Sequence, residues 1–299
     1  MAETPERHRI IVFGDVIDDV VAVPLAPVRV DTDTPSSIRY RAGGSAANTA
    51  AWLGAAGADV DFVGRVAAAD VRRHEQLLSD AGVRPRLAAD PLLPTGTIVV
   101  VVDGERRTMF TERGANDALD PSAISETLLE GASLVHFTGY SLFGGQDKDG
   151  LAALIARARA SGARVSVDPG SAGFIVDFGV EAFLHTVAGA SVIFPNFEEG
   201  KALTGLENPA LMARELSQSF GLAVVTLGTD GAVFAIDGGK PVHVPAMAAK
   251  VVDPTGAGDA FSAGFLDHWL RTGKVLGAAR AGARTAATAV GVVGGRPLV

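Results

Sequence analysis

A glycine-rich turn near the end of the chain has the residue types for phosphate chemistry. Residues 253–261 read Asp-Pro-Thr-Gly-Ala-Gly-Asp-Ala-Phe and lead into a helical pattern. Backbone N–H groups at a helix start attract anions, and Gly256 and Gly258 admit a phosphate close to the backbone. Asp259 would repel that anion unless it serves as a general base. An N-terminal helix cap is the alternative, and the residues alone leave the two interpretations equally open.

A second glycine pair, Gly43-Gly44, precedes another predicted helix that begins Ser-Ala-Ala-Asn. Asn48 falls in its first turn, where the amide can bind a substrate hydroxyl; close helix packing with a solvated Asn48 is the alternative. Three carboxylates follow the first predicted strand, at the edge where open α/β sheets bind ligands: Asp15, Asp18 and Asp19. They suit the recognition of adjacent hydroxyl groups, whereas an ordinary Asp-rich loop needs no ligand.

Two further stretches stand at the ends of predicted strands. Asn196 and Glu199 share one face at the start of a predicted helix. Glu199 can order magnesium-bound water there, or it can simply cap the helix. Residues 226–231 read Thr-Leu-Gly-Thr-Asp-Gly and turn at the end of a later strand. Such a turn can lie against a nucleotide or merely reverse the chain.

Composition limits the function classes. The chain has 299 residues, 47% hydrophobic content and a formal net charge of -8 without a basic cluster, so we expect a globular protein that does not bind nucleic acid. Cysteine is absent, which excludes disulfides, thiolate catalysis and cysteine–zinc sites. The start of the chain lacks the apolar core of a signal peptide, and no apolar stretch is as long as a membrane span. We therefore expect a cytoplasmic protein with no membrane partner.

The elements that must position these residues alternate along the chain. From about residue 120 onward, predicted helices precede short apolar strands, which is typical of a parallel sheet with helices on both faces. The predicted strands are 10–13, 60–63, 133–137, 163–167, 191–194 and 222–227, and the predicted helices are 46–57, 71–81, 121–130, 147–160, 179–188, 208–219, 257–272 and 275–290. A hairpin joins 232–236 to 241–244 through Asp237-Gly238-Gly239. No composition break divides the chain, so residues 1–299 are one predicted domain.

A second, smaller sheet is predicted outside the main one. Residues 28–30 and 37–40 look extended, and 97–102 with 105–110 form a hairpin. The Asp103-Gly104 pair between these last two strands favours a type I′ turn.

Taken in order, the four polar stretches resemble the ribokinase-like, or PfkB-type, family of carbohydrate kinases over essentially the whole chain. Residues 253–265 match its highly specific C-terminal signature, and 43–48 match its N-terminal signature. Asn196 and Glu199 match its Asn-x-x-Glu element, and 226–231 match its nucleotide-side loop. The resemblance implies a three-layer α/β/α sandwich with a mostly parallel central sheet. It also implies a small β-sheet lid over the substrate, formed by about 16–42 and 93–113.

The resemblance implies ATP-dependent phosphotransfer to a hydroxymethyl group of a sugar or sugar-like molecule. Asp259 would be the catalytic base, and the 255–258 loop would supply the anion hole through Gly256, Ala257 and Gly258. The sugar hydroxyls would be held by Asp19, Gly43, Gly44, Asn48 and Asp253. The ATP site would include Asn196, Thr226, Gly228 and Gly231. The ions would be Mg²⁺, bound by Glu199 through water, and K⁺, near Asp253, Thr255 and the 290–295 turn. Several relatives dimerise through the lid, which makes a homodimer of this kind the expected assembly.

Two departures from the family pattern bear on the substrate. Ile17 stands where the ribose enzyme has Asn, which removes one hydroxyl contact and argues against ribose itself. Many relatives carry a further C-terminal helix, and we expect this chain to be a shorter form.

Three alternatives concern what is bound. A nucleoside kinase for adenosine, cytidine or pseudouridine needs an aromatic wall, with Tyr40, Phe110, Phe137 and Tyr140 as candidates. Arg107 or Arg113 on the lid can instead meet the carboxylate of an acid sugar. A non-catalytic sugar-binding regulatory protein is the alternative from another class, but such a protein has no need of Asp259 and the anion loop.

Overall fold

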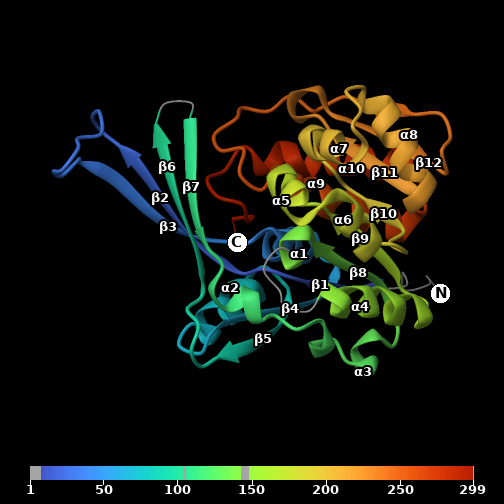
Figure 1. Cartoon of the computed structure of the whole chain (residues 1–299), viewed down its shortest axis with the longest axis horizontal. Coiled ribbons are helices and arrows are strands. Elements are labelled where there is room, and N and C mark those ends of the chain that lie inside the picture. The colour runs from blue at the N-terminus through green and yellow to red at the C-terminus, as the bar shows by residue number, and fades with distance from the viewer. Residues whose placement is uncertain (1–7, 104–105, 143–147, 299) are drawn as a thin grey trace, which may run out of the picture.

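A nine-stranded sheet forms the centre of the computed structural model, which describes residues 8–103, 106–142 and 148–298 (Figure 1). Its strands are β1 (Arg9–Phe13), β4 (Asp59–Ala67), β5 (Arg84–Asp90), β8 (Ala132–Thr138), β9 (Arg164–Asp168), β10 (Val192–Ile193), β11 (Leu222–Thr226), β12 (Ala232–Ile236) and β13 (Val242–Val244). Their order across the sheet is β13-β12-β11-β10-β9-β8-β1-β4-β5. Only β12 pairs antiparallel to its described neighbours, β11 and β13. The predicted mostly parallel sheet is thus confirmed.

Helices cover both faces of this sheet. One layer holds α1 (Ser45–Ala55), α2 (Val71–Asp80), α9 (Ala257–Thr272) and α10 (Val275–Ala289). The other holds α3 (Glu126–Leu129), α4 (Lys148–Ala160), α5 (Ala172–Phe178), α6 (Val180–Thr186), α7 (Phe197–Thr204) and α8 (Pro209–Phe220). Within β1, Ile10 and Val12 pack with the first layer, and Ile11 and Phe13 pack with the second. None of the helices in the described part of the chain combines the length and apolar character needed to span a bilayer.

A separate four-stranded sheet stands to one side of the main body (Figure 1, blue and green). It consists of β2 (Ile17–Pro24), β3 (Ser36–Gly43), β6 (Gly96–Asp103) and β7 (Arg106–Glu112), in the order β3-β2-β6-β7. We call it the small sheet. In its register, Asp19 of β2 lies opposite Arg41 of β3 and beside Ile98 of β6. These three residues therefore share one face of the small sheet.

Several local predictions were wrong. Residues 28–30 lie in the connection between β2 and β3, and the first strand of the small sheet is 17–24 instead. The edge strand β5 was not predicted, because it begins with the polar residues Arg84-Pro85-Arg86. In the structure both arginines bind Asp61 of β4.

Two helical predictions also differ. A 3-10 turn at Pro121–Ala123 and the short α3 replace the predicted helix 121–130, because Ser125 caps a new helix. The predicted helix 179–188 corresponds to α6, and α5 before it was not predicted. The Asp103-Gly104 turn and the side chain of Arg107 lie outside what the structure describes.

Candidate active site

Asp259 lies in the first turn of α9, where α9 packs against α1. Its Oδ1 accepts a hydrogen bond from the Ser45 hydroxyl at 2.7 Å, and its Oδ2 accepts one from the Asn48 amide at 2.9 Å. Asn48 is 211 positions away in the chain. The tertiary structure therefore joins the two glycine-rich stretches into one site.

The Asp259 carboxyl group has the electrostatic setting of a base. Burial beneath the surrounding protein raises its pKa from 3.8 to about 7, while part of its surface stays open to a cleft. Its donors Ser45 and Asn48 oppose that rise, and the charges of Asp15 and Asp19 add to it. A carboxyl group that titrates near neutral pH can accept and release a proton during turnover. The competing cap interpretation is not supported, because Gly256 is the N-cap of α9 and no side chain caps this helix.

Residues 255–258 form the turn that starts α9. Gly256 has a φ of 74°, and a Cβ there would lie 2.5 Å from the Gly295 Cα, so the turn requires glycine. A Cβ on Gly258 would meet nothing within 4 Å, because this position faces open space. The first intrahelical bond runs from Ala260 to the Gly256 carbonyl. The N–H groups of Gly258 and Asp259 precede it, so they have no carbonyl partner within the helix. N–H groups at such a position attract anions.

A cleft of about 490 Å³ opens beside Asp259, between the small sheet and the main body. We call it the carboxylate cleft, because its lining includes Asp15, Asp19, Asp168, Glu199 and Asp259. The small sheet lines the opposite side with Ile98, Val100, Met109 and Thr111. Carboxylates thus form one part of the lining, and side chains of β6 and β7, most of them apolar, form another.

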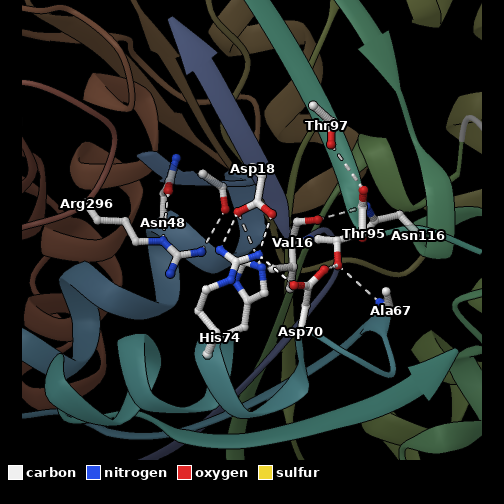
Figure 2. Close-up of polar contacts among 12 residues, drawn as sticks. Val16, Asp18, Asn48, Ala67, Asp70, His74, Thr95, Thr97, Asn116 and Arg296 are labelled. Carbon is white, nitrogen blue, oxygen red and sulfur yellow. Dashed lines mark hydrogen bonds and ion pairs between the residues drawn. The ribbon is translucent and has the colours of Figure 1, made fainter. Parts of the chain in front are cut away.

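The three carboxylates that follow β1 have different environments. Asp15 accepts bonds from the N–H groups of Ser45 at 2.8 Å and Ala46 at 3.0 Å, so it holds the start of α1. Asp18 turns toward α2 and binds the Arg73 guanidinium at 2.7 and 2.5 Å (Figure 2). Asp19 lines the carboxylate cleft, and burial raises its pKa to about 7. Of the three, Asp19 is best placed to accept hydrogen bonds from a ligand.

The glycine pair brings the backbone close to these carboxylates. A Cβ on Gly43 would lie 2.3 Å from Asp19 Oδ2, and one on Gly44 would lie 2.5 Å from the Asp15 carbonyl oxygen. Gly44 also has a φ of 91°, which favours glycine. Among the described residues, Gly44 lines the carboxylate cleft and Gly43 does not. Gly43 instead packs against the Asp19 side chain.

Asp253 precedes the 255–258 turn and is held by three hydrogen bonds. Its Oδ1 accepts bonds from the N–H of Thr255 at 3.0 Å and from the Thr255 hydroxyl at 2.7 Å. Its Oδ2 accepts a bond from the N–H of Gly294 at 3.0 Å. It therefore ties the 255–258 turn to the end of the chain, and it is not among the described residues that line the carboxylate cleft.

Asn196 and Glu199 form a capping box at the start of α7. The Glu199 N–H donates to Asn196 Oδ1 at 2.9 Å, and the Asn196 N–H donates to Glu199 Oε2 at 2.9 Å. Burial raises the pKa of Glu199 to about 7, and burial and the charge of Glu199 raise the pKa of Asp168. Two buried carboxyl groups that repel each other favour a cation between them. Within the described residues, no three acidic or histidine side chains are grouped so that they could hold a metal ion.

A second cleft, of about 560 Å³, lies on the other side of the 255–258 turn. We call it the alanine cleft, because its walls include Ala246, Ala248, Ala249, Ala283, Ala286 and Ala287. Thr226, Gly228, Gly231 and Ala257 also line it, as the resemblance implied for three of them. Most of its lining side chains are small and apolar. Gly258 lines both clefts, so they meet next to Asp259.

The aromatic residues proposed for a nucleobase wall are mostly misplaced. Tyr40 and Phe110 stand on the face of the small sheet that Asp19 does not share, and they are 74% and 60% exposed. Phe137 is fully buried in the core. Tyr140 alone of the four lines the carboxylate cleft, where Phe174 packs edge-on against it at 5.9 Å between ring centroids.

Several residues at this site were not predicted from the sequence. Asp168 ends β9 at the same edge as Asp15, a position that the strand pattern indicated. Arg113 was considered only as a ligand for an acid sugar, and it lines the cleft while donating to Asp117 and to the Tyr140 carbonyl. Arg296 reaches the site from the end of the described chain, which no local pattern signals.

Comparisons with known proteins agree with this geometry. Residues 7–298 match the pfkB family carbohydrate kinases. The chain is 33% identical to the ATP-dependent ribose-1-phosphate kinase of Halopiger xanaduensis over 282 residues, which cover 87% of this chain and 88% of that protein. Adenosine kinase from Sinorhizobium meliloti has the same fold, with a TM-score of 0.86, 24% identity, and coverage of 98% of this chain and 97% of that one. An E. coli protein solved with ATP and Mg²⁺ has a TM-score of 0.85 at 19% identity, covering 97% and 94%.

The chain therefore belongs to the pfkB family of carbohydrate kinases. Its fold is ribokinase-like, with the three layers and the small separate sheet that the resemblance implied. It is a kinase of sugars or nucleosides, and the family implies ATP with Mg²⁺.

Proposed function

We propose that this protein transfers the γ-phosphoryl group of ATP to a hydroxymethyl group of a sugar or sugar-like molecule. One observation carries the proposal: a carboxyl group with a pKa near 7, Asp259, lies at the junction of the carboxylate cleft and the alanine cleft. The acceptor would occupy the first cleft and the nucleotide the second. Their reacting ends would meet at Gly258 and Asp259, as in-line transfer requires.

In this mechanism Asp259 takes the proton of the acceptor hydroxyl as its oxygen attacks the γ-phosphorus. The bond to the bridging oxygen breaks, and ADP leaves with the negative charge. The N–H groups of Gly258 and Asp259 face the charge that develops on the transferring group, and Asp19 and Asn48 hold other hydroxyls of the acceptor. Mg²⁺, when bound, neutralises phosphate charge, and Asp168 and Glu199 would hold it through water.

Asp259→Asn tests the base. The variant should keep its fold and its ATP affinity. Its turnover should fall about a thousandfold, because asparagine can neither accept the hydroxyl proton nor supply the negative charge of the carboxylate. ADP release would be measured with ribose, fructose, 2-keto-3-deoxygluconate, ribose 1-phosphate, adenosine, cytidine and pseudouridine. Asp267→Asn, on the same helix, is the matched control. Turnover like that of the unmodified protein in Asp259→Asn would reject the base.

Sugar phosphates are the first acceptors to test, because the Halopiger xanaduensis relative is named a ribose-1-phosphate kinase. A nucleoside kinase is the second candidate. The observation that favours it is the apolar wall of the carboxylate cleft, where Tyr140 and Phe174 stand with Ile98, Val100 and Met109. A nucleoside acceptor should lose affinity about tenfold in Tyr140→Ala, whereas a small sugar should be little affected.

Two further expectations belong to this proposal. The 290–295 turn packs against the anion loop through the Asp253–Gly294 bond, which supports K⁺ binding there. Exchanging K⁺ for Li⁺ should then lower turnover.

The small sheet would act as the lid. Its outer face exposes Ile38, Tyr40 and Phe110, which supports a homodimer through this face. Light scattering of Tyr40→Asp should then show monomers where the unmodified protein shows dimers.

A further inference from the structure

Arg296 reaches back from the end of the described chain to the start of α1. Its Nη2 donates to the Gly43 carbonyl at 2.7 Å, and its Nε donates to Asn48 Oδ1 at 3.4 Å (Figure 2). The preceding residues are fixed as well, because the Trp52 ring N–H donates to the Gly295 carbonyl at 2.9 Å. The guanidinium is therefore held behind the glycine pair and Asn48.

The contact with Arg296 helps the Asp259 carboxylate to set which way the Asn48 amide points. A guanidinium has only donors, so it requires the amide oxygen to face it. The amide NH₂ group must then face Asp259, where it donates to Oδ2 at 2.9 Å. With the Ser45 hydroxyl on Oδ1, both oxygens of Asp259 face donors. Arg296 thus acts on Asp259 through Asn48.

Arg296 also supplies a positive charge to Asp19. Burial raises the pKa of Asp19, the charges of Asp15, Asp18 and Asp253 raise it further, and the charge of Arg296 lowers it. Two other arginines lie nearby. Arg41 shares the face of Asp19, but it is exposed and donates to the Tyr40 carbonyl, and Arg73 is bound to Asp18 through two hydrogen bonds. Arg296 lies near Asp19, because the Gly43 backbone that it binds packs directly against the Asp19 carboxyl group. Its charge therefore favours the charged form of Asp19, which can accept bonds from two hydroxyls.

Arg296 is half-buried, and keeping its guanidinium out of water costs free energy. Burial lowers its pKa to about 10, and its Nη1 has no hydrogen-bond partner among the described residues. Packing alone would be met at lower cost by an uncharged side chain of similar length, such as Met. The charge and the two donated bonds are what such a side chain would lose.

We propose that Arg296 is a positioning residue for the acceptor site: it fixes the amide of Asn48 toward Asp259 and keeps Asp19 ready to bind acceptor hydroxyls. Arg296 touches neither the acceptor nor the nucleotide in this scheme. The proposal rests on the proposed function for the acceptor, but the coupling between Arg296 and Asp19 does not depend on turnover.

The test compares Arg296→Gln, which can still donate one bond but has no charge, with Arg296→Lys, which keeps the charge without the fork of donors. Arg271→Gln, an exposed ion-pair partner on α9, is the control. The first readout is carbon NMR titration of aspartate carboxyl groups, with the Asp19 signal assigned through Asp19→Asn. The second is the KM for the acceptor and for ATP, measured from pH 6 to 9 with the best acceptor of the panel above.

In Arg296→Gln the Asp19 midpoint should rise by about one pH unit, and the acceptor KM should rise about tenfold while the ATP KM stays within about twofold. Arg296→Lys should restore the Asp19 midpoint but not the full acceptor affinity. If Arg296→Gln does not fold, the comparison of Arg296→Lys with the unmodified protein provides the test. An unchanged Asp19 midpoint and an unchanged acceptor KM in a folded variant would overturn the proposal. If the unmodified protein phosphorylates nothing in the panel, the proposed function fails, and the Asp19 midpoint alone decides whether Arg296 controls that carboxylate.

Discussion

Replacing Asp259 with asparagine should make the protein more stable at alkaline pH. Asp259 has a pKa of about 7 in the folded protein and 3.8 as an ordinary side chain. Between these values the folded state keeps a proton that the unfolded state has lost, so stability falls as pH rises through this range. Above about pH 8 the folded protein must hold a buried charge next to Asp15 and Asp19. The variant Asp259→Asn removes that charge while keeping the shape of the side chain.

The structure sets the size of this effect. A shift of about three pKa units corresponds to ~4 kcal/mol at full ionisation. Against it, the new amide turns an NH₂ group toward the Asn48 NH₂ or the Ser45 hydroxyl, which costs about 1–2 kcal/mol. The net expectation is a gain of roughly 2 kcal/mol at pH 8.5, equivalent to a rise in Tm of roughly 4 °C. At pH 4, where the native carboxyl is protonated, only the cost remains.

Urea unfolding followed by tryptophan fluorescence at several pH values between 4 and 9 would measure the difference between the two proteins. Asp267→Asn is the control, because Asp267 lies on the same helix in an exposed ion pair with Arg271. This variant removes a carboxylate from the same helix outside the cleft, so it shows how much of the difference is specific to Asp259. A difference for Asp259→Asn that is equally flat between pH 4 and 9 would show that Asp259 has an ordinary pKa, and the argument for a poised base would fail.

Three other predictions follow from the same site. Below about pH 7, kcat/KM should fall about tenfold per pH unit, because protonated Asp259 cannot accept the hydroxyl proton; a constant value from pH 5 to 8 would contradict this. Gly256→Ala should destabilise the protein by about 3 kcal/mol in urea unfolding, whereas Gly258→Ala should keep stability and lose turnover, because its Cβ enters the space of the phosphate. Glu199→Gln should raise the Mg²⁺ concentration for half-maximal rate about tenfold, with the exposed Glu198→Gln unchanged.

The sequence by itself determined the fold class and the family. Apolar runs such as 10–13 alternate with helical patterns, and such runs are stable only when helices bury both faces of the strand. The glycine turn at 255–258 could be located because its backbone geometry admits few other residues. These signals are local, so neighbouring residues are enough to define them.

Only the tertiary structure decided which polar residues meet. Whether Asp18 or Asp19 faces the cleft depends on the register of β2 in the small sheet, since successive side chains of a strand point to opposite faces. The same register turns Tyr40 away from the cleft. The contact of Arg296 with Asn48 closes a loop of 248 residues, and the pKa of Asp259 depends on burial by the whole fold. Burial and long-range contact are properties of the packed chain, and no short stretch of sequence contains them.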